Sequence, residues 1–313
     1  MADIILLAVG AGAAFLFGWN NSGLLIGNTR GSGALTGRES LAISSLGLML
    51  GVLAEGSKMT NSMNGGLVSA PTEASILVAL IVTVLLTLGL TLARLPVSLS
   101  MTVVGAFAGA AVGLSLRIDL NYLISVLAFW FVAPLAAAAL SFAIYLTISH
   151  FASRISLLSV DTLNRIGVFA SCIAVAYVLG ANNVGLIYGI VSPGREPTWQ
   201  SAALIITLGL LAILGMVALG RGSVSGTIGD RLLVLSPQGV LAAFLGSAIV
   251  VWAGTQFTLP ISITQCLLGA MFGVAYTKSI RVVNRRLALE TISSWVVVPV
   301  SAFVLSLAIT FLV

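Results

Sequence analysis

The chain has 313 residues, of which 59% are hydrophobic and only 7% are charged, with a formal net charge of +5. A soluble protein of this size does not need apolar residues on every face of nearly all its helices, so this composition excludes a soluble domain and indicates a polytopic membrane protein. The basic residues lie between apolar runs, where they indicate orientation in the membrane, and they give no reason to expect nucleic acid as a partner.

In chain order, apolar runs separated by Gly, Pro and charged residues predict about ten membrane segments. They cover residues 3–18, 39–55, 74–93, 96–115, 121–149, 164–180, 199–219, 237–256, 260–277 and 287–313. The first run lacks a basic leader and a cleavage motif, so we expect a retained membrane segment. The expected fold class is an all-α polytopic membrane protein.

The chain repeats itself at an almost constant offset. GWNN at 18–21 is matched by GANN at 180–183, LPVSLSMTVVGAFAG at 95–109 by LPISITQCLLGAMFG at 259–273, and FWFVAPLAAAALSFAI at 129–144 by SWVVVPVSAFVLSLAI at 294–309. Each half holds five predicted segments, an odd number, so the second half should cross the membrane in the opposite direction. This pattern predicts two inverted-topology repeats, residues 1–150 and 151–313, with broken or re-entrant helices.

The charges predict the orientation. With both termini outside the cell membrane, 11 of the 14 Lys and Arg residues fall on inner connections, as the positive-inside rule requires. They are Arg30, Arg38, Arg94, Arg154, Arg165, Arg221, Arg231, Lys278, Arg281, Arg285 and Arg286. Lys58, Arg117 and Arg195 fall outside.

The first polar interruption, GWNNSGLLIGNTRGSGALTG at 18–37, is expected to break the helix at membrane depth. A break of this kind exposes N–H groups at the positive end of the next half-helix, where an anion binds well. Ser32 adds a hydroxyl donor within this stretch. Thr36 followed by Glu39 matches a capping box and predicts a helix that starts near residue 37.

The second pair of interruptions places Pro before alternating hydroxyls, as LPVSLS at 95–100 and LPISIT at 259–264. Pro suits the first turn of a helix, and the hydroxyls of Ser98, Ser100, Ser262 and Thr264 lie beside free N–H groups. Two such helix starts, related by inversion, can meet near the midplane and hold one tetrahedral oxyanion. Taken singly, each hydroxyl is also explained as an ordinary helix cap.

GWNNSGLLIGNTRGSGALT resembles the signature of the inorganic phosphate transporter (PiT) family, GANDVANAFGTSVGSGALT, and LPVSLSMTVVGAFAG is similar to its PVSTTHAIVGAIAG. The second copy, GANNVGLIYGIV with LPISITQCLLGAMFG, fits as well. The resemblance implies sodium- or proton-coupled uptake of phosphate, occasionally sulfate, and a homodimer. The positions it keeps are Asn20, Asn182, Ser98, Ser262 and Thr264, with Ser100 in place of Thr.

The departures concern charge. The family's Asp falls on Asn21 and Asn183, and its His falls on Met101 and Gln265. Because an amide oxygen ligates sodium more weakly than a carboxylate, we expect a proton as the coupling ion, with sodium as the alternative.

Two charged residues are further candidates. Glu55 is a candidate proton carrier, or else a charge at a helix end. Arg30 is a candidate anion ligand through its planar guanidinium, or else an arginine at the membrane surface.

These patterns predict a secondary transporter of a small inorganic oxyanion that works by alternating access. Phosphate is the expected substrate, with a sulfate permease of the same fold and an anion channel or uncoupled exchanger as alternatives. The other expected partner is membrane lipid. No catalytic or metal-ligand spacing is found, so neither an enzyme nor a cofactor is expected.

Overall fold

The computed structural model describes residues 2–93, 97–192, 198–220, 235–278 and 285–312. Apart from two isolated β-bridges, these ranges form helices and turns. The first half contains α1 (Ala2–Gly31), α2 (Gly37–Glu55), η1 (Gly56–Met59), α3 (Thr60–Met63), α4 (Glu73–Leu92), α5 (Leu99–Gly113) and α6 (Leu120–Ala152). The second half contains α7 (Leu157–Val178), η2 (Leu179–Val184), α8 (Gly185–Val191), α9 (Trp199–Gly220), α11 (Pro237–Gln256), α12 (Ile263–Lys278) and α13 (Arg285–Thr310).

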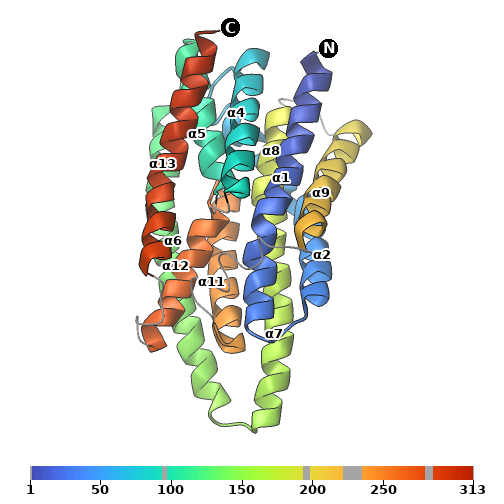
Figure 1. Cartoon of the computed structure of the whole chain (residues 1–313), viewed down its shortest axis with the longest axis vertical. Coiled ribbons are helices and arrows are strands. Elements are labelled where there is room, and N and C mark those ends of the chain that lie inside the picture. Colours follow the sequence, from blue (N-terminus) through green and yellow to red (C-terminus); the bar gives the residue numbers. More distant parts are fainter. Residues whose placement is uncertain (1, 94–96, 193–197, 221–234, 279–284, 313) are drawn as a thin grey trace.

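The two halves run through the bundle in opposite directions. Both termini lie at one end, whereas the junction of the long helices α6 and α7 lies at the other end (Figure 1). Equivalent helices of the two halves make equivalent contacts. In one pair of contacts, α1 packs on α9 and its counterpart α7 packs on α2. In the other, α5 packs on α13 and its counterpart α12 packs on α6. The predicted inverted repeat is therefore confirmed.

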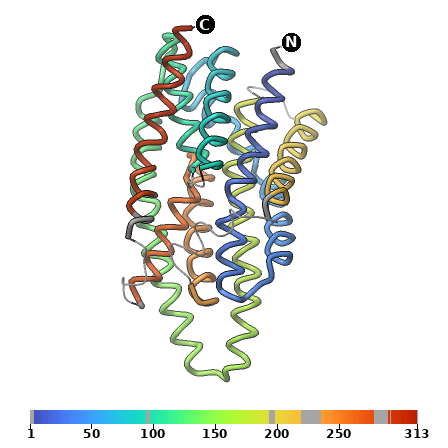
Figure 2. Tube along the Cα trace, in the orientation of Figure 1, coloured from blue at the N-terminus to red at the C-terminus, as the bar shows by residue number. Residues whose placement is uncertain are grey.

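Each half contains a helical hairpin that turns back in the middle of the bundle. Hairpin 1 consists of α4 and α5 and occupies the half near the termini, and hairpin 2 consists of α11 and α12 and occupies the opposite half (Figure 2). Among the described residues, eight helices have the length and composition to cross a membrane, and α5 and α12 are shorter apolar helices. These ten helices agree with the ten predicted segments, including the expected re-entrant ones.

The charge prediction falls partly on residues that the structure does not describe. Five arginines of that prediction lie outside the described residues, namely Arg94, Arg195, Arg221, Arg231 and Arg281.

The Asn-rich stretch does not break the first helix, contrary to expectation. α1 continues through it to Gly31, and the non-helical connection is limited to residues 32–36. The polar side chains bond inside the helix, since Asn21 Nδ2 donates to Phe17 O at 3.0 Å and Asn28 Nδ2 donates to Leu24 O at 2.7 Å. In the second half, the matching residues form the π-helical turn η2, which widens the helix but leaves it continuous.

The predicted capping box at the start of α2 is present. Glu39 N donates to Thr36 Oγ1 at 3.2 Å, and Thr36 N donates to Glu39 Oε2 at 2.8 Å. Glu39 also forms a salt bridge of 2.7 Å with Arg165 of α7. The start of α2 is thus fixed by local bonds and by its neighbour in the other repeat.

Two equivalent helix crossings depend on glycine. A Cβ on Gly105 of α5 would lie 2.2 Å from Pro299 O of α13, and a Cβ on Gly269 of α12 would lie 2.2 Å from Pro134 O of α6. Glycine at these positions allows the backbones to touch, as in the small-residue contacts of membrane helices. Hairpin arms α5 and α12 are therefore closely attached to α13 and α6.

Candidate functional site

The tips of the two hairpins place two serine-capped helix starts inside the protein. At the start of α5, Met101 N donates to Ser98 Oγ at 3.4 Å, and the hydroxyls of Ser98 and Ser100 are 3.2 Å apart. At the start of α12, Gln265 N donates to Ser262 Oγ at 3.2 Å. Ser98, Ser100, Ser262 and Thr264 are all buried. The structure therefore puts all four predicted hydroxyls in the two hairpin tips, beside the positive ends of helices.

The first Asn of each Asn-Asn pair holds a hairpin. Asn20 Nδ2 of α1 donates to Thr91 Oγ1 in the last turn of α4 at 2.9 Å, and Asn182 Nδ2 of η2 donates to Thr255 Oγ1 of α11 at 3.0 Å. The two contacts are equivalent in the repeat. Sequence reasoning missed Thr91 and Thr255, although both lie a few residues before the Pro of the two hairpin motifs.

Asn182 also binds the backbone of hairpin tip 2 (residues 257–264). Its Nδ2 donates to Leu259 O at 3.0 Å, and its Oδ1 accepts from Ile261 N at 3.2 Å. On the other side of the tip, Trp130 Nε1 of α6 donates to Pro260 O at 2.9 Å. Two consecutive peptide groups, 259–260 and 260–261, are therefore fixed, and with them the direction of the α12 start.

The second Asn of each pair keeps unused hydrogen-bonding capacity. Asn21 and Asn183 are both buried. Within the described part of the chain, Asn21 Oδ1 and Asn183 Nδ2 have no hydrogen-bond partner. Because buried polar atoms are nearly always paired in proteins, such atoms point to a bound ligand or water.

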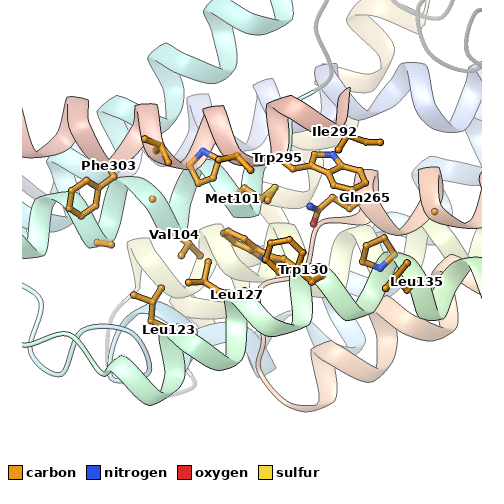
Figure 3. Close-up of a pocket in the computed structure, with 18 of the residues that line it drawn as sticks. Met101, Val104, Leu123, Leu127, Trp130, Leu135, Gln265, Ile292, Trp295 and Phe303 are labelled. Atoms are coloured by element: carbon orange, nitrogen blue, oxygen red, sulfur yellow. The ribbon is translucent and has the colours of Figure 1, made fainter. Parts of the chain in front are cut away.

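Gln265 follows the hydroxyls of tip 2 and lies between the indole rings of Trp130 and Trp295, next to Met101 (Figure 3). It is only 2% exposed, and its Oε1 has no partner among the described residues. Met101 holds the equivalent position of the first repeat, so the polar atom is present on one side only.

Two predicted residues lie away from the tips. Arg30 is exposed in the last turn of α1, and Ser32 is in the following turn, where its hydroxyl donates to Thr29 O at 2.8 Å. This turn lies at the α6–α7 end of the bundle, whereas the tips lie in its middle (Figure 1). The structure does not bring Arg30 or Ser32 together with the four hydroxyls.

Glu55 lies at the end of α2 in a cluster of polar side chains. Its carboxylate is 3.3 Å from Lys58 Nζ and accepts from Gln256 Nε2 of α11 at 2.9 Å and from Trp252 Nε1 at 3.4 Å. Lys58 also donates to Gln256 Oε1. Glu55 therefore contacts one arm of hairpin 2 and is already paired with a cation.

Comparisons with known proteins show the family and the fold of this chain. The profile of the phosphate transporter family matches residues 17–160 and again residues 154–306. A protein of Haemophilus influenzae named "Putative phosphate permease" is 30% identical over 161 residues, which are 46% of this chain and 37% of that protein. A protein of Methanocaldococcus jannaschii with a similar name is 25% identical over 187 residues, 59% of this chain and 58% of that protein. These matches span less than two thirds of the length of either relative.

A solved structure described as "The sodium-dependent phosphate transporter" has the same fold. The TM-score is 0.82 at 20% identity, and the match covers 99% of this chain and 98% of that chain. The double match of the family profile extends over nearly the whole sequence and coincides with the two halves of the fold. This chain belongs to the phosphate transporter family, whose members are transport proteins and not enzymes.

Proposed function

We propose that the chain is a secondary transporter that moves phosphate across the cell membrane by alternating access around the two hairpin tips. The observation that carries this proposal is the pair of buried, serine-capped helix starts that enter from opposite ends of the bundle. Free N–H groups and hydroxyls at these starts bind an oxyanion without a cationic side chain. The proposed ligands are Ser98, Ser100, Ser262 and Thr264, with Asn20 and Asn182 positioning the hairpins.

Asn21 favours phosphate over sulfate as the substrate. Its buried Oδ1 is an acceptor without a donor in the described structure. Protonated phosphate carries O–H groups that can donate to it, whereas sulfate carries none at neutral pH. An unpaired buried acceptor costs about 1–3 kcal/mol, so phosphate should bind roughly tenfold or more tightly than sulfate.

The same residues suggest how a proton is coupled to transport. The described residues of the tips and of both Asn pairs include no Asp or Glu, and Glu55 is occupied by Lys58 and Gln256. We infer that the proton enters on the substrate itself, as protonated phosphate. Sodium bound by the amide oxygens of Asn21 and Asn183 is the weaker alternative, because these ligands carry no charge.

Uptake into proteoliposomes tests the proposal. Labelled phosphate and sulfate are each offered under an imposed proton gradient and under an imposed sodium gradient. We expect phosphate to accumulate with the proton gradient and to lose that accumulation when a protonophore is added. Movement that only equilibrates the anion indicates a channel or exchanger, and movement of neither anion contradicts the proposed substrate.

The variant Glu55→Gln tests where the proton travels. If the substrate carries the proton, proton-driven phosphate uptake persists in this variant. Loss of proton dependence with intact phosphate binding would identify Glu55 as the carrier instead. Lys58→Met is the matched control, because it breaks the same ion pair and leaves the carboxyl group in place.

The location of both termini outside the cell and the homodimer stay predictions from the sequence.

A further inference from the structure

The turn that leads from α11 into hairpin tip 2 is strained at Thr258. The turn is of the Schellman type, in which Leu259 N donates to Gly254 O at 3.0 Å. Thr258 N donates to Thr255 O at 3.1 Å, and Thr258 has the left-handed backbone conformation with φ of 57°. Glycine is the usual residue at this position. Because a β-branched residue adopts the left-handed conformation only under strain, other contacts must hold Thr258 there.

Tyr122 of α6 supplies such a contact. Its hydroxyl donates to Thr258 O at 2.7 Å, across 136 residues of sequence. The hydroxyl of Ser62 in α3 lies 2.8 Å from the same phenol oxygen. Because a phenol has a single proton, which goes to Thr258 O, Ser62 is the donor in the second bond. Ser62 is fully buried, and its bond keeps the Tyr122 hydroxyl directed at the strained turn.

The carbonyl oxygens of three consecutive tip residues each accept a hydrogen bond from a side chain of another element. The pairs are Thr258 with Tyr122, Leu259 with Asn182, and Pro260 with Trp130. A carbonyl oxygen carries partial negative charge, so one that turned toward a bound oxyanion would repel it. The three donors hold these oxygens in place. The tip can then offer the anion the N–H groups and hydroxyls at the start of α12.

The repeat pattern does not account for Tyr122. Trp130 and Trp295 are equivalent in the two repeats and lie 165 positions apart, and the same offset places Leu287 opposite Tyr122. Leucine has no hydroxyl group and cannot make the equivalent bond. The tryptophan is therefore a shared part of the repeat, whereas the phenol is an addition on the side where it meets the strained Thr258.

We propose that Tyr122 is a positioning residue of the phosphate site and acts through the strained peptide of Thr258, an inference that rests on the proposed function. With the phenol bond in place, Thr258 stays left-handed and the next residues lead directly into the start of α12. Without that bond, Thr258 relaxes to an unstrained conformation, and the backbone that carries Ser262 and Thr264 turns with it. These two hydroxyls then leave the position in which they bind the anion.

Phosphate binding to the purified full chain tests the proposal in a double-mutant cycle. Tyr122→Phe keeps the ring and should weaken phosphate binding about three- to tenfold, the size expected for one hydrogen bond. Thr258→Gly adopts the left-handed conformation without strain and should bind phosphate like the parent chain. In the Thr258→Gly background, Tyr122→Phe should cost less than about twofold, because no strain remains to be held. Tyr276→Phe is the control and should bind like the parent, since it removes an exposed hydroxyl from α12 of the same hairpin.

Amide hydrogen exchange of residues 259–266, measured without substrate, separates this inference from the proposed function. Exchange should be several-fold faster in Tyr122→Phe than in the parent chain. If the parent chain binds no phosphate, the proposed function fails, and exchange alone decides whether Tyr122 positions the tip.

In a parent chain that binds phosphate, the proposal requires that Tyr122→Phe shows both weaker binding and faster exchange. Either change without the other overturns it. An equal loss of binding in the parent and in the Thr258→Gly background overturns the action through Thr258. A lower unfolding temperature of Tyr122→Phe with unchanged binding would show that the phenol only stabilises the fold.

Discussion

The side-chain amide of Asn182 is bonded to the carbonyl oxygen of Leu259 at 3.0 Å, across 77 residues of sequence. This contact joins the π-helical turn of the second repeat to the tip of hairpin 2. The same amide binds Thr255 and Ile261, so a single side chain sets the position of the α12 start. The equivalent Asn20 makes one such bond in the described part of the chain, to Thr91.

This difference predicts unequal effects of two equivalent substitutions. Asn182→Ala leaves the buried Ile261 N–H without its acceptor, at a cost of about 1–3 kcal/mol, and should lower phosphate affinity about tenfold or more. Asn20→Ala loses only its bond to a hydroxyl and should have a smaller effect. Phosphate binding to purified protein measures both. Equal losses would contradict the special role of Asn182.

We expect Ser98 and Ser262 to bind the anion in addition to capping their helices. Ser98→Ala and Ser262→Ala each remove a hydroxyl donor and should each weaken phosphate binding by about tenfold, equivalent to ~1.4 kcal/mol. Ser156→Ala is the matched control, because Ser156 caps α7 in the same way at an exposed position. If all three variants bind phosphate like the parent chain, Ser98 and Ser262 are plain helix caps.

Placing aspartate at Asn21 and Asn183, where the family has Asp, should make phosphate uptake depend on sodium. The double change of Asn21→Asp and Asn183→Asp adds two carboxylates beside the hairpins, and carboxylate oxygens bind hard cations more strongly than amides do. We expect phosphate uptake to become dependent on sodium. Asn28→Asp is the control, because Asn28 lies in the same helix with the same bond to the carbonyl four residues before it. Sodium dependence that appears equally in the control would point to a general charge effect.

Two glycine substitutions, one at a helix crossing and one away from any neighbour, should have opposite effects on the free energy of unfolding. In Gly269→Ala the new Cβ would lie 2.2 Å from Pro134 O, so α12 and α6 must separate, at a cost of about 1–3 kcal/mol. Gly89→Ala meets no atom within 4 Å and should stabilise its helix by about 0.5–1 kcal/mol. Thermal unfolding in detergent measures both. A Gly269→Ala protein as stable as its parent would show that the crossing is not tight.

Features that depend on composition and local bonding could be predicted from the sequence. The all-helical membrane class, the inverted repeat and the capping box of Thr36 and Glu39 were all correct, because each rests on residues close together or on a repeated pattern. The hydroxyls of the hairpin tips belong to the same group, since Pro and Ser mark a helix start locally.

Only the tertiary structure decided how these parts act together. The Asn-rich stretch looked like a helix break, yet α1 stays continuous because its amides bond to carbonyls of the same helix. The pairing of Asn20 with Thr91 and of Asn182 with Thr255 joins residues 71 and 73 positions apart. Sequence alone determined which segments enter the membrane, because hydrophobicity is a property of each segment. Long-range packing decided where they turn and which polar atoms stay free for a ligand.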